Sequence, residues 1–138
     1  VLELEQRVTS TSPEADLVDT YINPPRWRAR AALSWRRSGL STDLFVNHTD
    51  SYVDNRVPSA LKPIRSFTTV DLRVAYDFSS RFKGGVLSGF TIAAGAINLL
   101  NEDPPPTTIT SPVSDIGFDY ANANPLGRLI SIELTKTW

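Results

Sequence analysis

The sequence predicts an all-β protein, built as an antiparallel up-and-down meander of about six strands. Two observations lead to this prediction. Apolar and polar residues alternate along several segments, which is the two-residue period of a β-strand. Short turns also alternate with long connections rich in Pro, Asp and Asn, so every predicted strand is followed by a chain reversal. The expected strands are 1–9, 26–37, 40–54, 66–79, 88–98 and 127–138.

The alternation is clearest in segments 26–37 and 66–79. One face of the first segment carries Trp27, Ala29, Ala31, Leu33 and Trp35, and one face of the second carries Val70, Leu72, Val74, Tyr76 and Phe78. The opposite faces carry mainly Arg, Asp and Thr. Each segment therefore predicts a strand with one apolar and one polar face.

The other four strands alternate less regularly. Segment 1–9 sets Leu2 and Leu4 against charged residues, and segment 40–54 is interrupted by Phe45. The mainly apolar face of segment 40–54 carries Leu40, Leu44, Val46 and Tyr52. That of segment 88–98 carries Phe90, Ile92, Ala94 and Ala96. That of segment 127–138 carries Ile130, Ile132, Leu134, Lys136 and Trp138.

The connections differ in length in a regular order. The turns at 37–39 and 81–85 are short, whereas the connections 10–25, 55–65 and 99–126 are long. A meander of six strands would therefore carry its long loops at one end and its short turns at the other.

Composition excludes several function classes. The net charge of −1 gives no electrostatic reason to expect nucleic acid as a partner. The chain has no cysteine, which removes disulfides and thiol chemistry, and its one histidine, His48, cannot build a metal site alone. Asp50, Asp54, Asp115 and Asp119 lack the spacing of an EF-hand. We therefore expect no catalytic site, no metal and no cofactor.

Aromatic residues favour a membrane-facing apolar surface over a soluble core. Trp27 and Trp35 bracket one strand, and eight residues at about 3.3 Å each, tilted by about 40°, span roughly 20 Å. This approaches the apolar band of an outer-membrane barrel, whose two borders carry aromatic side chains. Tyr76 and Phe78 are expected at the border of Trp35, and Tyr52 at that of Trp27.

The same rule orients the chain. Outer-membrane barrels have short periplasmic turns and long outer loops, so the strand 127–138 is expected to end at the periplasmic border with Trp138. The chain begins within a predicted strand, and we expect it to be a piece of a longer protein. In isolation it would be an open curved sheet.

Five segments together resemble the C-terminal end of a TonB-dependent outer-membrane receptor. They are PPRWRARAALSW, LFVNHTDSY, SFTTVDLRVAYDF, AINLLNEDPPP and GFDYANANPLGRLISIELTKTW, in that order. The resemblance implies a 22-stranded barrel in the outer membrane of a Gram-negative bacterium, with a plug domain in its lumen. It also implies active uptake of a scarce nutrient of the siderophore, cobalamin or oligosaccharide class.

The resemblance also implies partners. These are outer-membrane lipid, the plug domain, the remaining barrel strands, the TonB system and, through the last strand, the barrel-assembly machinery. The plug and the segment that contacts TonB are expected outside this chain. Lys136 departs from the family pattern and is expected to extend its amine to the lipid headgroups.

Charged residues on the polar faces would point into the lumen. They are Glu3, Glu5, Arg7, Arg26, Arg28, Arg30, Arg36, Asp43, Asp71, Arg73 and Asp77. Cross-strand ion pairing is the expected role of most of them. Arg26, Arg28 and Arg30 form the densest group and are the candidate contacts for an anionic substrate. In the 99–126 loop, Phe118 and Tyr120 either contact a substrate or pack onto the barrel rim.

Two alternatives remain open at this stage. The first is a soluble β-sandwich or lectin-like binding module, in which the apolar face is an inner core. The second is a small self-closing outer-membrane barrel, although the smallest bacterial barrels have eight strands.

Overall fold

A computed structural model describes residues 5–6, 15–113 and 115–138. These residues divide into two compact units. We call residues 30–47, 68–102 and 126–138 the sheet unit, and the described parts of 1–29, 48–67 and 103–125 the loop unit. Glu3 and Arg7, both expected to face the lumen, lie outside the described residues.

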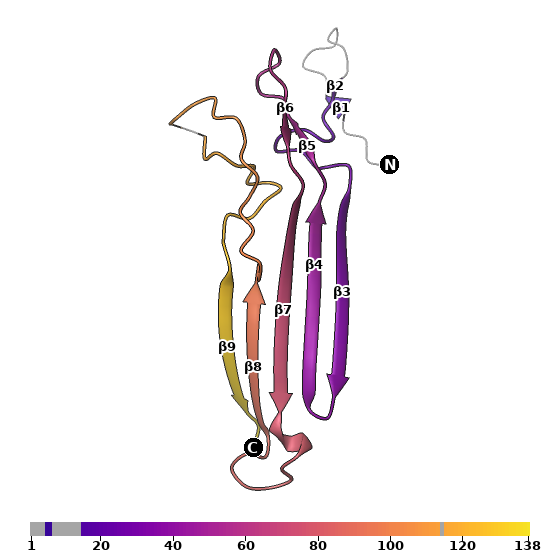
Figure 1. The fold of residues 1–138 in the computed structure, drawn as a ribbon, viewed down its shortest axis with the longest axis vertical. Coiled ribbons are helices and arrows are strands. Elements are labelled where there is room, and N and C mark those ends of the chain that lie inside the picture. The colour runs from indigo at the N-terminus through magenta and orange to yellow at the C-terminus, as the bar shows by residue number, and fades with distance from the viewer. Residues whose placement is uncertain (1–4, 7–14, 114) are drawn as a thin grey trace. The chain divides into compact units, whose positions relative to one another are not determined.

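The five long strands form one open sheet (Figure 1). They are β3 (Arg28–Arg37), β4 (Leu40–Thr49), β7 (Phe67–Asp77), β8 (Phe90–Ile97) and β9 (Leu129–Lys136). Their order in the sheet is β3-β4-β7-β8-β9, so each strand lies beside the next long strand along the chain. This confirms the predicted all-β, antiparallel meander as an open sheet, but the sheet has five strands rather than about six, because the described part of the expected strand 1–9 pairs elsewhere.

The register of β7, β8 and β9 brings their apolar positions into line. Tyr76 pairs with Ile92, which pairs with Leu134. The rows Val74–Ala94–Ile132 and Leu72–Ala96–Ile130 follow at two-residue steps. Because side chains alternate between faces, these nine residues share one side, which we call the apolar face. The intervening rows, Arg73–Gly95–Ser131, Ala75–Ala93–Glu133 and Asp77–Thr91–Thr135, form the polar face.

The apolar face is exposed rather than buried. Ile132 retains 74% of its accessible surface, Ile130 67% and Leu134 62%. Leu33, on β3, retains 68%. A soluble sandwich would bury these side chains in its core, so their exposure in the sheet unit disfavours the soluble alternative.

A two-residue turn joins β3 to β4. Ser38 and Gly39 both have positive φ, at 49° and 85°, as the tightest hairpin turns require. The Gly39 carbonyl accepts a hydrogen bond of 2.9 Å from the Asp77 amide at the end of β7. The turn therefore also ties the β3–β4 hairpin to its neighbour.

The connection between β7 and β8 is longer than the expected turn at 81–85. It spans residues 78–89 and begins with the short 3-10 helix η1 (Phe78–Ser80). The Asp77 carboxylate ends the strand by accepting a 2.8 Å hydrogen bond from the Ser79 amide. Phe78 was expected within a strand and is instead the first residue of η1.

The loop unit contains two small two-stranded sheets. β1 (Glu5–Gln6) pairs with β2 (Ala15–Asp16), and β5 (Tyr52–Asp54) pairs with β6 (Lys62–Ile64). The described part of the expected strand 1–9 thus belongs to this unit. The buried apolar side chains among the described residues of the unit include Val18, Tyr52, Ile64, Phe67 and Ala123. No helix among the described residues is long and apolar enough to cross a membrane.

The expected strand 40–54 is divided between β4 and β5. It breaks at Asp50 and Ser51, where the Asp50 carboxylate accepts a 2.7 Å hydrogen bond from the Ser51 amide. Tyr52 begins the second strand and is 4% exposed. The expectation that Tyr52 faces lipid at the membrane border was therefore wrong, because this side chain is buried within the loop unit.

Candidate functional site

A buried ion pair organises the loop unit. The Arg56 guanidinium donates to both carboxylate oxygens of Asp54, at 2.9 and 2.8 Å, and the Asp54 side chain is 1% exposed. Arg56 also lies 3.2 Å from the Asp115 carboxylate and donates to the Thr108 carbonyl. The Cζ atom of its guanidinium lies 3.7 Å from the centre of the Tyr21 ring. One arginine thus joins three separate loop segments.

These contacts shift the pKa values of both Asp54 and Arg56. The hydrogen bonds from Arg56 hold the pKa of the Asp54 carboxyl well below its usual range, and a 2.9 Å bond from the Thr108 amide adds to this. The same pairing raises the pKa of Arg56. The Asp115 pKa is lowered chiefly by hydrogen bonds from Thr110. All three groups therefore stay charged through the physiological pH range.

A second carboxylate, Asp119, lies four residues after Asp115 and is fully buried. It accepts hydrogen bonds from the Ile22 amide at 2.9 Å, the Ala121 amide at 3.0 Å and the Asn122 side chain at 2.8 Å. Asn122 also donates to the Asn23 carbonyl at 2.8 Å. These bonds connect residues almost one hundred positions apart, and they satisfy the buried carboxylate.

Burial raises the pKa of Tyr52, and the negative charge of Asp119 raises it further. The Tyr52 hydroxyl is directed toward Asp119 and Asn122 but makes no hydrogen bond of ordinary geometry with the described residues. Tyr52 is therefore neutral at physiological pH and packs as part of the loop unit's interior.

The three arginines expected to bind an anionic substrate already have partners. Arg26 lies 3.0 Å from Asp19 and 3.6 Å from Asp16, and Arg28 donates to the Asn122 side chain. Arg30, in the sheet unit, sits 4.8 Å above the ring of Phe45. Phe45, which interrupts the alternation of its strand, thus supplies a stacking surface for Arg30.

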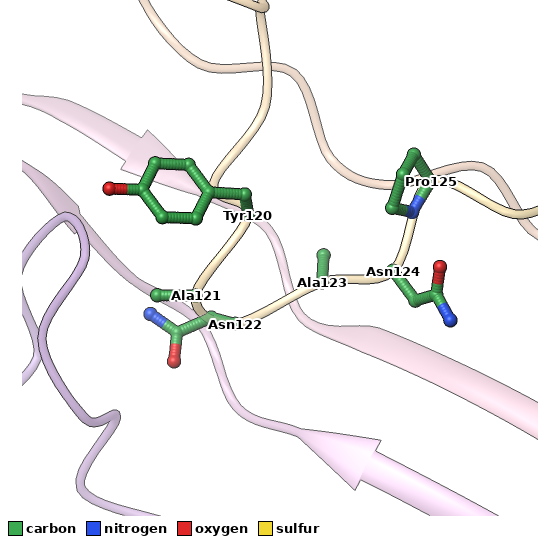
Figure 2. Close-up of a pocket in the computed structure, with 6 residues that line it drawn as sticks. All are labelled: Tyr120, Ala121, Asn122, Ala123, Asn124 and Pro125. Carbon is green, nitrogen blue, oxygen red and sulfur yellow. The ribbon is translucent and has the colours of Figure 1, made fainter.

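The two aromatic residues expected in the long loop differ in exposure. Phe118 is half-buried and forms an isolated bridge with Pro106, whereas Tyr120 is 64% exposed. Tyr120 borders a hollow of about 340 Å³ lined by residues 120–125 (Figure 2). Its ring and the Asn122 amide extend to one side of this stretch, and the Asn124 amide to the other. Tyr120 is the accessible aromatic of the pair.

Several side chains on the polar face of the sheet unit contact side chains of the neighbouring strand. Arg36 lies 3.3 Å from Asp43, which also accepts a 2.5 Å hydrogen bond from Ser34. Asn47 donates to Asp71 at 3.0 Å. A hollow of about 290 Å³ on this face is bordered by Arg30, Phe45, Asp71, Arg73, Gly95 and Ser131. Such contacts between neighbouring strands are the expected pattern for charged residues on a hydrated face.

Comparison with known families decides between the interpretations. The TonB dependent receptor-like, beta-barrel family matches residues 5–99, which is more than half of the chain. The chain belongs to this family. Among curated proteins no relative matches it, and no solved structure matches it either. The match ends at residue 99 and so leaves out most of AINLLNEDPPP and all of GFDYANANPLGRLISIELTKTW, two of the five segments that carry the resemblance.

Membership explains the two faces of the sheet. TonB-dependent receptors are outer-membrane transporters rather than enzymes, and the wall of such a barrel has one face toward lipid and one toward the lumen. A strand with apolar residues on one side and paired charges on the other meets both requirements. A wall of this kind needs no buried core between its two faces.

The three tryptophans expected to border the membrane occupy exposed positions, whereas Tyr76 and Phe78 are half-buried. Trp35 is 48% exposed, and Trp138 is fully exposed. Trp27, 55% exposed, makes an edge contact with His48 at 5.3 Å between ring centres. Tyr76 packs against Phe78 at 4.9 Å.

Lys136 has a different partner from the one expected. Its amine donates to the carbonyl of Val86 at 2.9 Å and also to that of Ser88, rather than extending away from the protein. The lysine thus fastens the end of β9 to the β7–β8 connection.

Sequence reasoning did not find the polar network of the loop unit. Asp54 ends the three-residue strand β5, and Arg56 and Asp119 lie in irregular segments, so no long periodic pattern indicates which of these side chains are buried. The one available signal was the density of Asp and Asn in the long connections, because buried carboxylates in loops commonly accept backbone amides.

Proposed function

We propose that this chain forms part of the barrel wall and outer loops of a TonB-dependent receptor that takes up a scarce nutrient of the siderophore, cobalamin or oligosaccharide class. The register of β7, β8 and β9 is the observation that carries the proposal, because it lines up nine apolar positions on one exposed face. A wall between lipid and an aqueous lumen needs this arrangement.

The partners follow from the two faces. The apolar face lies against outer-membrane lipid, and the polar face lines the lumen that holds the plug domain. The remaining barrel strands continue the sheet at its edges, and the TonB system acts through a segment outside this chain. Strand β9 is the element that the barrel-assembly machinery would recognise during insertion.

Substrate capture falls to the loop unit. Tyr120 is the strongest candidate contact, because its ring is exposed beside a hollow that also includes the Asn122 and Asn124 side chains. Phe118, Arg26 and Arg28 are weaker candidates in the same unit, since each already contacts another residue of that unit. Arg30 belongs to the sheet unit, where it stacks on Phe45.

The test is deletion of the full-length gene in its host, followed by growth with iron, cobalamin or glycan as the limiting nutrient. We expect impaired growth on one of the three, restored by the intact gene only when TonB is functional. The protein should fractionate with the outer membrane. Normal growth under all three limitations, or a protein found outside the outer membrane, would refute the proposal.

A further inference from the structure

The β7–β8 connection, residues 78–89, carries a group of features that the wall function leaves unexplained. It is well ordered by hydrogen bonds: the Phe82 amide donates to the Phe78 carbonyl at 2.8 Å, and the Gly89 amide to the Ser79 hydroxyl at 2.7 Å. Lys136 binds the carbonyls of Val86 and Ser88. These bonds fix the backbone of the connection near both of its ends.

Aromatic rings extend the apolar face into this connection. Tyr76 and Phe90 belong to the apolar side of β7 and β8, and Phe78 packs against both, at 4.9 and 5.9 Å between ring centres. Phe82 stacks on Phe78 at 6.4 Å with an interplanar angle of 28°. The apolar surface thus continues past the ends of the strands and finishes at Phe82.

Two cations flank this last ring. Arg81 and Lys83 are both exposed, and within the described residues neither side chain has an acidic or hydrogen-bonding partner. Residues 78–89 contain no Asp or Glu. Val86 beside them is 87% exposed and Leu87 is 41% exposed. Apolar side chains bordered by unpaired cations are typical of surfaces that lie at the headgroup level of an anionic membrane.

We propose that Arg81 and Lys83 form a binding site for the phosphate group of an anionic phospholipid, with Phe82, Val86 and Leu87 in contact with its acyl chains. The site commits to a membrane phospholipid because one short connection carries both exposed cations and exposed apolar residues, whereas a soluble phosphate would need only the charges. This inference rests on the proposed function, which places the connection at the periplasmic leaflet. Figure 1 shows the connection at the same end of the sheet unit as the β3–β4 turn.

The experiment uses the full-length receptor in nanodiscs of phosphatidylethanolamine with a small fraction of phosphatidylglycerol. Native mass spectrometry measures how much phosphatidylglycerol stays bound on release from the disc. Each cation near an anionic surface contributes about fivefold to binding, so the variant R81Q/K83Q should retain roughly 25-fold less. The charge-conserving variant R81K/K83R should retain as much as the wild type.

The control variant is K62Q, which removes an exposed cation from β6 in the loop unit and should leave bound phosphatidylglycerol unchanged. Equal retention by R81Q/K83Q and wild type would overturn the proposal, as would equal retention of phosphatidylethanolamine and phosphatidylglycerol by the wild type. Loss of the lipid on adding inorganic phosphate would identify a simple phosphate site and also overturn it. Outer-membrane fractionation of the same variants shows separately whether the proposed function holds.

Discussion

Arg73 on β7 lies 3.3 Å from Glu133 on β9, although strand β8 runs between them. The two side chains meet above Gly95 and Ala93, the positions of β8 that pair with Arg73 and Glu133. Neighbouring strands lie about 4.8 Å apart, so the ion pair crosses roughly twice that distance. Small residues in the middle strand make this contact sterically accessible.

This ion pair should contribute little to stability. The side chains of Arg73 and Glu133 are 47% and 62% exposed, and exposed pairs contribute about 0.2–1 kcal/mol. In a double-mutant cycle with Arg73→Ala and Glu133→Ala, we expect a coupling free energy below about 1 kcal/mol in urea unfolding of the receptor in lipid vesicles. Coupling above about 2 kcal/mol would show that the lumen face is less hydrated than its exposure indicates.

Gly39 should be a sensitive glycine of the sheet unit. Its φ is 85°, and an added methyl group would lie 2.5 Å from the Asp77 carbonyl oxygen. Gly39→Ala therefore introduces both backbone strain and a clash with main chain, and we expect a loss of about 1–3 kcal/mol in unfolding free energy.

Gly84→Ala is the matched control, because no heavy atom lies within 4 Å of a methyl group added there. We expect its unfolding free energy to stay within about 0.5 kcal/mol of wild type. If the two variants were equally stable, the turn between β3 and β4 would have to differ from the one described.

The Asp54–Arg56 pair should make the loop unit sensitive to acid. The folded-state pKa of Asp54 is held below the unfolded-state value of about 3.9, so the pair stabilises the loop unit above that pH. This stability is lost as the pH falls below about 5 toward the folded-state pKa. Protection factors for hydrogen exchange at residues 52–56, corrected for the intrinsic exchange rate at each pH, should therefore fall below about pH 4, while those in β8 should change less.

Asp54→Asn tests this assignment. At pH 7 the variant leaves Arg56 without its main buried partner, and we expect the loop unit to open about 3 kcal/mol more readily, as for other broken buried pairs. Its exchange should also depend less on pH, since the Asp54 carboxyl is gone and Asp115 is the acidic partner of Arg56 that remains among the described residues. An unchanged pH profile would assign the acid sensitivity to another carboxylate.

The sequence was sufficient to predict the sheet but not the loop unit. Alternation along β7, β8 and β9 identified the apolar face because the strand period is built into the backbone. The end of β4 could not be predicted, since Tyr52 keeps the same parity as Val46 across the break. That break depends on contacts such as the 3.1 Å hydrogen bond from the Asp50 amide to the Trp27 carbonyl, which no local pattern encodes.

The same limit applies to the candidate site. The positions of Arg26, Arg28 and Arg30 on one strand face indicated a shared role, but each finds a different partner in the fold. Asp54 and Asp115 meet through Arg56 from segments about sixty residues apart, and sequence spacing contains no information on such a meeting. Charges in loops are placed by tertiary contacts, so their partners must be read from the structure.

Tyr120 should affect uptake without affecting folding. Its side chain is 64% exposed, so Tyr120→Ala should change the unfolding free energy by less than about 0.5 kcal/mol. If its ring contacts the substrate, loss of the aromatic surface should weaken binding to the receptor by about 1–2 kcal/mol, or roughly fivefold to 30-fold. Phe118→Ala is the comparison variant. Because Phe118 is half-buried, its truncation should lower the unfolding free energy as well.

The apolar face can be tested with two neighbouring residues of β9. Ile132→Arg places a charge among Ala94 and Val74 on the apolar face, and a charge on the lipid side near the bilayer midplane costs about 2–4 kcal/mol. Ser131→Arg places the same charge one residue earlier, on the polar face beside Gly95, where water is available and Glu133 lies two residues further along the strand. Folded receptor in the outer membrane, measured by heat-modifiable gel mobility, should therefore fall for Ile132→Arg and remain near wild type for Ser131→Arg. The opposite order would mean that the apolar face points into the lumen, and the assignment of both faces would have to be exchanged.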